Sequence, residues 1–174
     1  PFSKLRHAVL SPLSISLHTL VSMGELEPIN LESAETFGPP DFKDYPWKRL
    51  LQIRACTECG RCQDACPAYA TGQPLSPKAL IIDLRRGIER TFRRPPSFQK
   101  AANGTCPAID SATAESPWAC VTCGACMERC PVFIEHVPAI DDMLRYPVME
   151  QAEYPGVMQA EEAWLGARGH PLRW

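Results

Sequence analysis

The sequence predicts a mainly α-helical protein with an extended N-terminal arm and further helices at its C-terminal end. The chain has 174 residues and 18 prolines. Because proline interrupts regular elements, short helices and loops are favoured over long strands. Residues 78–92 carry a strong helical pattern of apolar side chains, and prolines open further helical segments after residue 137. The length fits one domain, or one small core with long arms.

The overall composition excludes several classes of protein. Hydrophobic residues make up 45% of the chain and charged residues 22%, which argues against wholesale disorder and against a multi-span membrane protein. The formal net charge is -2, whereas a nucleic-acid-binding protein normally carries a basic excess. We therefore expect no nucleic-acid partner.

Residues 1–48 are predicted to form a membrane-proximal amphipathic helix and an acidic linker. The stretch Ala8–Met23 contains a proline, a histidine and several serines, so it is too short and too polar to span a bilayer. Ser11 followed by Pro12 predicts the helix start, and Gly24 predicts its end. Four leucines recur at helical spacing with serines largely between them: Leu10, Leu13, Leu17 and Leu20.

Two interpretations of this helix remain open. Its leucine stripe packs on the domain or on a neighbouring subunit, or the helix lies in a membrane interface with Lys4, Arg6 and His7 among the lipid headgroups. Acidic residues, glycine and prolines then predict an extended linker over residues 25–48. The sequence WKRLLQIRA from Trp47 predicts a short helix that leads into the first cysteine run.

Eight of the nine cysteines lie in two runs with the same spacing, CTECGRCQDACP at residues 56–67 and CVTCGACMERCP at residues 120–131. Disulfide scaffolds scatter their cysteines along the chain, so they fit poorly. Zinc sites usually collect two CxxC pairs across a longer loop. Each run instead matches CxxCxxCxxxCP, the bacterial ferredoxin pattern in which the fourth cysteine ligates the other of two clusters. The sequence therefore predicts two [4Fe-4S] clusters.

The crossed pattern predicts which cysteines share a cluster. For cluster 1 the predicted ligands are Cys56, Cys59, Cys62 and Cys130, and for cluster 2 they are Cys120, Cys123, Cys126 and Cys66. The same cysteines are the metal ligands, and no catalytic residue is predicted. Because each cluster is completed by the other run, the two runs must pack together around a pseudo-two-fold relation.

Two further residue types occupy equivalent positions in both runs. Gly60 and Gly124 follow the second cysteine, where glycine lets backbone amides approach the cluster sulfurs. Pro67 and Pro131 follow the fourth cysteine, where proline fixes the turn that redirects the thiolate.

Two other residues have both a plain interpretation and a functional one. Cys106 is most simply a free thiol in a long connection. His136, just after the second run, either satisfies a local backbone group, or tunes a cluster by hydrogen bonding or carries a proton.

The segment between the runs decides the fold class. A compact ferredoxin joins its motifs by short strands and turns, whereas here residues 67–119 contain a helix capped by Ser76 and Pro77. Its apolar face comprises Leu80, Ile81, Leu84 and Ile88. This arrangement predicts an all-helical dicluster ferredoxin domain over residues 49–146.

Residues 147–174 are predicted to be a C-terminal helical extension that leads to a missing downstream domain. Helix starts are predicted at Pro138, Pro147 and Pro155. Apolar side chains on these helices are expected to cover the clusters or to pack on a following domain: Ile140, Met143, Leu144, Val157, Met158, Trp164 and Leu165.

The segments ACTECGRCQDACPAYATGQPLSPKALIIDLR and WACVTCGACMERCPVFIEHVPAIDDMLR resemble the iron–sulfur region of heterodisulfide reductase D-type proteins. The chain is most similar to their membrane-linked branch, which is electron-transferring flavoprotein:menaquinone oxidoreductase-like. The resemblance implies a membrane haem/quinone domain before this region and a cysteine-rich CCG-type domain after it. It also implies a flavoprotein partner such as electron-transferring flavoprotein. No membrane bundle, haem-ligand region or CCG motif lies in these 174 residues, so any quinone site or substrate-converting centre is expected elsewhere.

The sequence thus predicts a redox module of a quinone-linked oxidoreductase. It would relay electrons between a soluble flavoprotein or cysteine-rich redox centre and a membrane haem/quinone site. One alternative is the iron–sulfur subunit of a succinate-, glycolate- or glycerol-3-phosphate-type dehydrogenase. Another, of a different class, is a zinc-stabilised interaction module. Because thiolate-ligated clusters are kept in reducing compartments, we expect the module on the cytoplasmic face of the membrane, tethered or peripheral.

Overall fold

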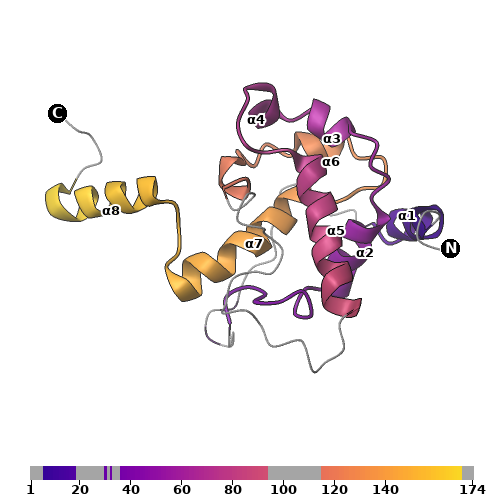
Figure 1. Ribbon diagram of the computed structural model, residues 1–174, viewed down its shortest axis with the longest axis horizontal. Helices are drawn as coiled ribbons and strands as arrows, with labels where there is room; N and C mark the ends of the chain where they lie inside the picture. The colour runs from indigo at the N-terminus through magenta and orange to yellow at the C-terminus, as the bar shows by residue number, and fades with distance from the viewer. Residues whose placement is uncertain (1–5, 19–29, 31, 33–35, 94–114, 170–174) are drawn as a thin grey trace.

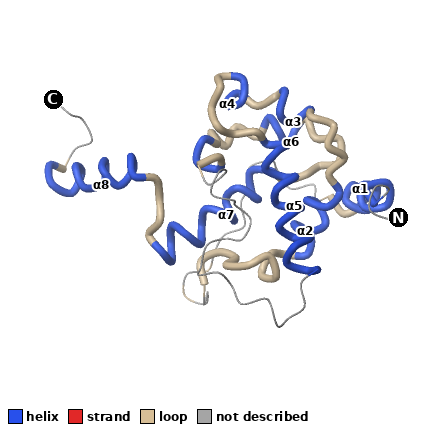
Figure 2. The backbone as a smooth tube through the Cα atoms, in the orientation of Figure 1, coloured by secondary structure: helices blue, strands red, loops and turns tan. Residues whose placement is uncertain are grey.

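The computed structural model describes residues 6–18, 30, 32, 36–93 and 115–169. Within these ranges every regular element is a helix and no strand occurs (Figure 2). The helices in chain order (Figure 1) are α1 (Arg6–Ser16), α2 (Trp47–Ala55), α3 (Arg61–Asp64), α4 (Pro67–Ala70), α5 (Pro77–Arg93), the 3-10 helix η2 (Pro117–Ala119), α6 (Ala125–Glu128), α7 (His136–Gln151) and α8 (Gly156–Arg168). The predicted mainly helical fold is confirmed.

Helix α5 contributes the largest face of the apolar core. The backbone N–H of Ala79 donates to Ser76 Oγ at 3.2 Å, so the predicted cap is present. The four predicted core residues of this helix are all buried: Leu80, Ile81, Leu84 and Ile88. They share one core cluster with Ile140 and Met143 of α7. Burying each such side chain contributes about 1.5–3 kcal/mol, so α5 and α7 form the frame that holds the cysteine loops.

The end of the predicted acidic linker is part of this core. Phe42 and Tyr45 are buried, with their ring centroids 5.6 Å apart, and they join the same cluster as Ile53 of α2. Helix α2 begins at Trp47, as the sequence predicts. The linker therefore ends as a packed segment beneath α2.

Gly38 brings this linker directly onto α7. A Cβ at Gly38 would lie 2.8 Å from the backbone nitrogen of Tyr146 and 2.9 Å from Cβ of Arg145, and its φ is +124°. Only glycine adopts that conformation without strain and also fits the space. The N–H of Phe37 donates to Glu150 Oε1 at 3.0 Å, which holds the linker on the second half of α7.

Helix α7 corrects the prediction of a helix start at Pro147. It runs without a break from His136 to Gln151, with Pro147 inside. An internal proline costs one backbone hydrogen bond and normally kinks a helix; here Gly38 and Phe37 pack on the same stretch of α7. The predicted domain boundary between residues 146 and 147 lies inside this helix and stays a prediction.

Helix α8 does not cover the cysteine loops. None of its residues is buried, and Val157, Met158 and Leu165 are 76%, 50% and 44% exposed. Figure 1 shows it leading away from the other helices. The prediction that its apolar residues shield the clusters is therefore wrong; packing on a following domain stays a prediction. Ile140 and Met143 of α7 are buried as predicted.

Helix α1 lies against α2 with the opposite face to the one predicted. Pro12 falls inside the helix, so Ser11 and Pro12 do not mark its start. Ser11 and Ser14 are buried, whereas Leu13 and Leu17 are 44% and 40% exposed. Packing of the leucine stripe on the domain is therefore wrong for Leu13 and Leu17, whereas Leu10 is half-buried. Leu20 and Gly24 lie outside the described residues. No helix in the described part of the chain is long and apolar enough to cross a membrane.

Candidate metal centre

The two cysteine runs fold in the same way. In each run a loop carrying the first two cysteines turns at a glycine into a four-residue helix, α3 or α6. The carbonyl of Gly60 accepts hydrogen bonds from the third and fourth helical residues at 2.9 and 3.1 Å, and the carbonyl of Gly124 does so at 2.9 and 3.1 Å. The predicted duplication is thus present in the backbone, and α3 and α6 contact each other.

Both runs place two residues in the left-handed region of backbone space. Gly60 and Gly124 have φ of +87° and +75°, which glycine adopts without strain. Glu58 and Thr122, just before the second cysteine of each run, have φ of +58° and +51°. That conformation is costly for a non-glycine residue, above all for a β-branched one, and such strain gathers at functional sites.

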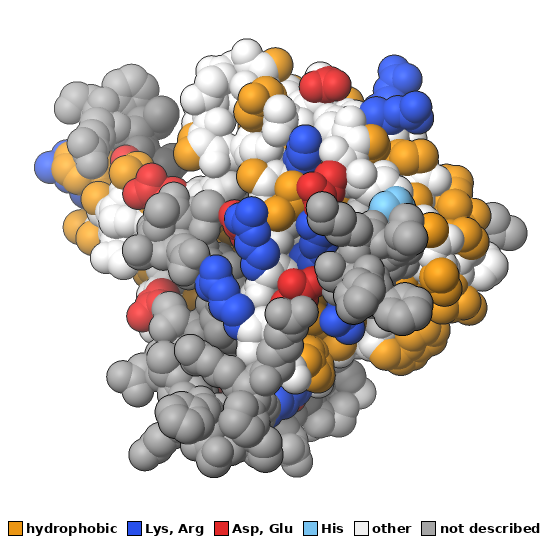
Figure 3. Space-filling model, turned by 45° about the vertical axis from the view of Figure 1, so that its right-hand side comes forward, with side chains coloured by type: hydrophobic (Ala, Val, Ile, Leu, Met, Phe, Trp, Pro, Cys, Tyr) orange, Lys and Arg blue, Asp and Glu red, His pale blue; other side chains and the backbone are white. Residues whose placement is uncertain are grey.

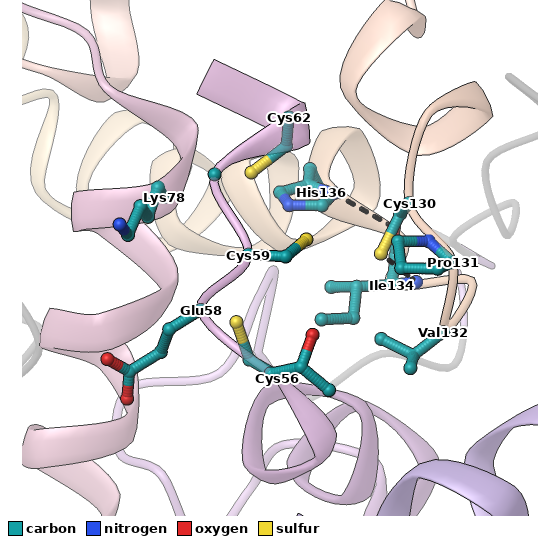
Figure 4. Close-up of a pocket in the computed structure, with 12 residues that line it drawn as sticks. Cys56, Glu58, Cys59, Cys62, Lys78, Cys130, Pro131, Val132, Ile134 and His136 are labelled. Atoms are coloured by element: carbon teal, nitrogen blue, oxygen red, sulfur yellow. Dashed lines mark hydrogen bonds between the residues drawn. The ribbon is translucent and has the colours of Figure 1, made fainter. Parts of the chain in front are cut away.

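The first pocket, which we call pocket 1, combines cysteines of both runs (Figure 4). It has a volume of about 300 Å³, and its wall includes four cysteines: Cys56, Cys59, Cys62 and Cys130. Gly60 and Pro131 also line it. The four cysteines predicted to share cluster 1 therefore lie around one space.

The second pocket, pocket 2, mirrors the first. It has a volume of about 320 Å³ and is lined by Cys120, Cys123, Cys126 and Cys66. Gly124 and Pro67 line it as well. The structure thus brings all twelve predicted site residues to two pockets, in the two predicted groups. Cys106 lies outside the described residues.

The chemistry of the pockets fits anionic sulfur ligands around a cationic core. The eight cysteines of the two runs are free thiols. Burial, together with the neighbouring cysteines of both runs, raises the pKa of Cys62 to about 11 and that of Cys126 to about 12. Burial likewise raises the pKa of Cys56 and Cys120. Buried thiols of this kind become thiolates when bound iron compensates the negative charge.

Backbone amides already point at several of the sulfurs. The N–H of Thr122 donates to Cys120 Sγ at 3.4 Å, and the buried N–H of Ile134 donates to Cys130 Sγ at 3.4 Å. The backbone N–H of Glu58 has the same relation to Cys56 and lowers its pKa against the larger effect of burial. Hydrogen bonds to the sulfurs stabilise an anionic cluster and help to set its potential.

The arrangement of the cysteine sulfurs differs from that in a site for a single metal ion. In a zinc centre every sulfur lies about 2.3 Å from one ion. Among the described residues, no three His, Cys, Asp or Glu side chains are placed to hold one metal ion. The sulfurs instead line the walls of two separate pockets, four in each, which suits a cluster with iron at several corners.

Comparison with known families agrees with this geometry. Residues 55–134 match the sequence family of the 4Fe-4S dicluster domain. We call this matched segment the dicluster domain. The two [4Fe-4S] clusters predicted from the cysteine runs are thereby supported, and a zinc-stabilised module is set aside. The domain is an iron–sulfur electron-transfer module of the ferredoxin kind.

Three curated relatives extend the similarity beyond the dicluster domain. The EtfAB:quinone oxidoreductase of Syntrophomonas wolfei is 35% identical over 91% of this chain and 25% of its own length. The probable iron-sulfur-binding oxidoreductase FadF of Bacillus subtilis is 32% identical over 98% of this chain and 29% of its own length. The probable membrane-anchored ferredoxin of Chromohalobacter salexigens is 36% identical over 75% of this chain and 22% of its own length.

This chain therefore spans between 22% and 29% of the length of these relatives. No solved structure matches the chain.

The two pockets of the dicluster domain differ in their electrostatic surroundings. Lys78 lines pocket 1 (Figure 4). Beside it Arg85 forms an ion pair with Glu58, and this hydrogen bond lowers the pKa of Glu58. Arg85 also donates to the carbonyl of Cys56 at 3.4 Å. Apart from its cysteines and Gly124, pocket 2 is lined only by apolar side chains. Because nearby charge and hydrogen bonding set cluster potentials, we expect two different potentials.

The structure shows the plain interpretation of His136, in which it satisfies a local backbone group, and its effect on a cluster stays a prediction. Its Nδ1 lies 2.9 Å from the carbonyl oxygen of Ile134; since a carbonyl only accepts, Nδ1 carries the proton. Burial lowers the pKa of His136 to about 4, so the imidazole is neutral near pH 7. The residue satisfies a backbone group and also lines pocket 1.

Several residues of the site are not evident from the sequence. Glu58 and Thr122 are chemically unlike each other, so comparing identical positions in the two runs does not single them out. Their equivalent place before the second cysteine is the only signal. From α5, Lys78 lines pocket 1 and Arg85 bonds to the carbonyl of Cys56 in its wall, and both contacts depend on tertiary packing.

Proposed function

We propose that the dicluster domain relays single electrons between a soluble flavoprotein and a membrane haem/quinone site. The observation that carries the proposal is the crossed composition of the pockets, each lined by three cysteines of one run and one of the other. Two such centres on one shared scaffold suit a short relay. When bound, a [4Fe-4S] cluster supplies one-electron transfer at a potential set by its surroundings.

The proposal gives each predicted residue a defined task. Four thiolates hold cluster 1, from Cys56, Cys59, Cys62 and Cys130, and four hold cluster 2, from Cys120, Cys123, Cys126 and Cys66. Gly60 and Gly124 turn the backbone into the helices beside them at positive φ. Pro67 and Pro131 set the chain direction after the fourth cysteine. Amides such as that of Ile134 bond to the sulfurs.

The names of the relatives support the choice of partners. One is a quinone oxidoreductase named for EtfAB and another is named a membrane-anchored ferredoxin. We propose electron-transferring flavoprotein, or a protein like it, as the soluble partner, and a membrane haem/quinone domain on the other side. This corresponds to the membrane-linked branch of heterodisulfide reductase D-type proteins, with a CCG-type domain following. Because its clusters need a reducing compartment, the module is placed on the cytoplasmic face of the membrane.

Stepwise reduction tests the relay. We expect the cluster-loaded chain, mixed anaerobically with reduced electron-transferring flavoprotein, to lose its visible absorption and to show the EPR signal of reduced clusters. A water-soluble menaquinone analogue added afterwards is expected to restore the oxidised spectrum. The control is the Cys59→Ser chain, which lacks one ligand of pocket 1 and is expected to pass fewer electrons. Reduction by a succinate-type dehydrogenase flavoprotein, with none by electron-transferring flavoprotein, would support the dehydrogenase-subunit alternative instead.

A further inference from the structure

Helix α1 presents mainly apolar side chains to solvent and turns two serines toward the protein. Val9, Leu13 and Ile15 are 72%, 44% and 42% exposed, whereas Ser11 and Ser14 are 8% and 4% exposed. A solvated surface helix normally has the reverse arrangement. Figure 3 shows apolar side chains gathered on the right of the molecule, where α1 lies.

Two hydrogen bonds hold α1 in the orientation that exposes its apolar face. Ser11 Oγ donates to the carbonyl of Ala55 at 2.9 Å, and Ser14 Oγ donates to the carbonyl of Val132 at 3.3 Å; both bonds are buried. A buried hydroxyl or carbonyl without a partner is costly, so these bonds hold the serine face inward. Rotating α1 to hide its apolar face would break both. The apolar face therefore stays outside.

Phe133 enlarges the exposed apolar surface. Its side chain is 42% exposed, and its ring centroid lies 4.4 Å from that of His18. The residue has φ of +54°, a conformation that costs a non-glycine residue free energy. We call the surface made by Val9, Leu13, Ile15, Leu17 and Phe133 the α1 patch.

The α1 patch belongs to the side of the molecule that holds pocket 1. The two carbonyls that receive the serine hydroxyls belong to Ala55, which precedes Cys56, and to Val132, which follows Cys130 by two residues. Val132 itself lines pocket 1. None of the residues that line pocket 2 belongs to α1 or to the Val132–Phe133 turn. A partner bound to the α1 patch therefore lies nearer to pocket 1 than to pocket 2.

The charge of residues 1–24 indicates what kind of partner binds the α1 patch. Residues 1–24 contain no Asp or Glu, and their basic residues are Lys4, Arg6, His7 and His18. An apolar helix face preceded in the chain by Lys4 and Arg6 suits the interfacial layer of an anionic lipid bilayer. The acidic residues of the chain begin at Glu25, after this segment.

We propose that the α1 patch docks on an anionic lipid bilayer and so makes pocket 1 the membrane-facing centre of the relay. This proposal rests on the proposed function for its electron path. It adds the surface that meets the membrane and the order of the two centres: pocket 2 toward the soluble partner, pocket 1 toward the lipid.

Vesicle flotation with matched variants tests the docking. The whole cluster-loaded chain is expected to float with vesicles of phosphatidylcholine and phosphatidylglycerol. Because Val9 and Leu13 lie on the exposed face of α1, the double variant Val9→Gln, Leu13→Gln should keep its clusters but partition at least about tenfold less. The control is Val157→Gln, Met158→Gln on α8, which removes equally exposed apolar side chains and is expected to float unchanged. Equal losses in both variants, or no flotation of the parent chain, would overturn the proposal.

Hydrogen–deuterium exchange then locates the contact. Added vesicles should slow exchange in residues 7–18 and 131–134 and leave α5 and α8 unchanged. Protection of α5 or α8 instead, or protection of α1 without vesicles in a concentration-dependent dimer, would contradict lipid docking. The two proposals can be told apart. If the chain does not float but still passes electrons from the flavoprotein to a soluble quinone, only the docking proposal is wrong. If the chain floats but the flavoprotein does not reduce it, the relay proposal is wrong, and so is the assigned order of the two centres.

Discussion

Replacing Cys130 by serine is expected to remove the cluster held by the first cysteine run, although Cys130 belongs to the second. The reason is that Cys130 lines pocket 1 with Cys56, Cys59 and Cys62, and a cubane that loses one thiolate is opened to solvent and to loss of iron. Iron and acid-labile sulfide are expected to fall to about half of the parent value. EPR of the reduced protein should show one isolated cluster.

A set of four variants identifies which cluster remains. Cys130→Ser should leave the same EPR spectrum as Cys59→Ser, and Cys66→Ser should leave the same spectrum as Cys123→Ser. Cys130→Ala covers the case in which a serine oxygen replaces the sulfur as a ligand. If Cys130→Ser matched Cys123→Ser instead, the crossed assignment would be wrong and each run would hold its own cluster.

Replacing Arg49 by methionine is expected to have the second largest effect, through stability. Arg49 on α2 bridges two carboxylates, with Nη1 3.0 Å from Glu135 Oε2 and Nε 3.1 Å from Asp142 Oδ2. Its side chain is 13% exposed and theirs are 20% and 16% exposed. Because these side chains are only partly buried, removing Arg49 is expected to cost about 3 kcal/mol, the low end of the loss for a buried ion pair. In a chain of this size that lowers the melting temperature by roughly 10 °C, measurable anaerobically by helical circular dichroism.

Two control variants separate charge from geometry. Arg49→Lys keeps the charge but lacks the planar fork that joins two carboxylates, so it should recover only part of the loss. Arg86→Met removes the exposed pair with Asp83, whose side chains are 63% and 32% exposed, and should change stability by less than about 1 kcal/mol. A melting temperature of Arg49→Met equal to that of Arg86→Met would contradict the role given to Arg49.

The pH dependence of the Arg49 variant follows from its carboxylate partners. Burial raises the pKa of Asp142 despite Arg49, and loss of Arg49 raises it further. A folded-state pKa above the unfolded value gives stability that is present at low pH and is lost as pH rises. The deficit of Arg49→Met should therefore be smaller near pH 3.8, the ordinary pKa of an aspartate, than at neutral pH. Glu135 keeps Lys48, which helps to hold the pKa of that carboxyl below its usual value against the effect of burial.

The sequence predicted the features whose signal is local. The spacing of the two runs was enough to group Cys66 with Cys120 and Cys130 with Cys56, the groups that line the pockets. The helical periodicity of α5 predicted its buried face, because apolar residues three and four apart share one side of a helix.

The features that the sequence did not predict depend on tertiary contacts. The orientation of α1 follows from two distant carbonyls, those of Ala55 and Val132, that accept its serine hydroxyls. Helix α7 continues through Pro147, and the linker packs on the neighbouring residues of this helix at Gly38. The bridge from Arg49 to Asp142 joins residues far apart in the chain. Periodicity and spacing carry no information on such partners, so only the structure places them.

The most direct test of the account is iron and acid-labile sulfide analysis of anaerobically purified protein, combined with EPR after dithionite reduction. Two clusters on one scaffold predict about eight iron and eight sulfide per chain. They also predict the broadened spectrum of two interacting reduced cubes, because α3 and α6, which carry Cys62 and Cys126, contact each other. About four iron with a single sharp signal, or zinc without sulfide, would contradict the two-centre relay.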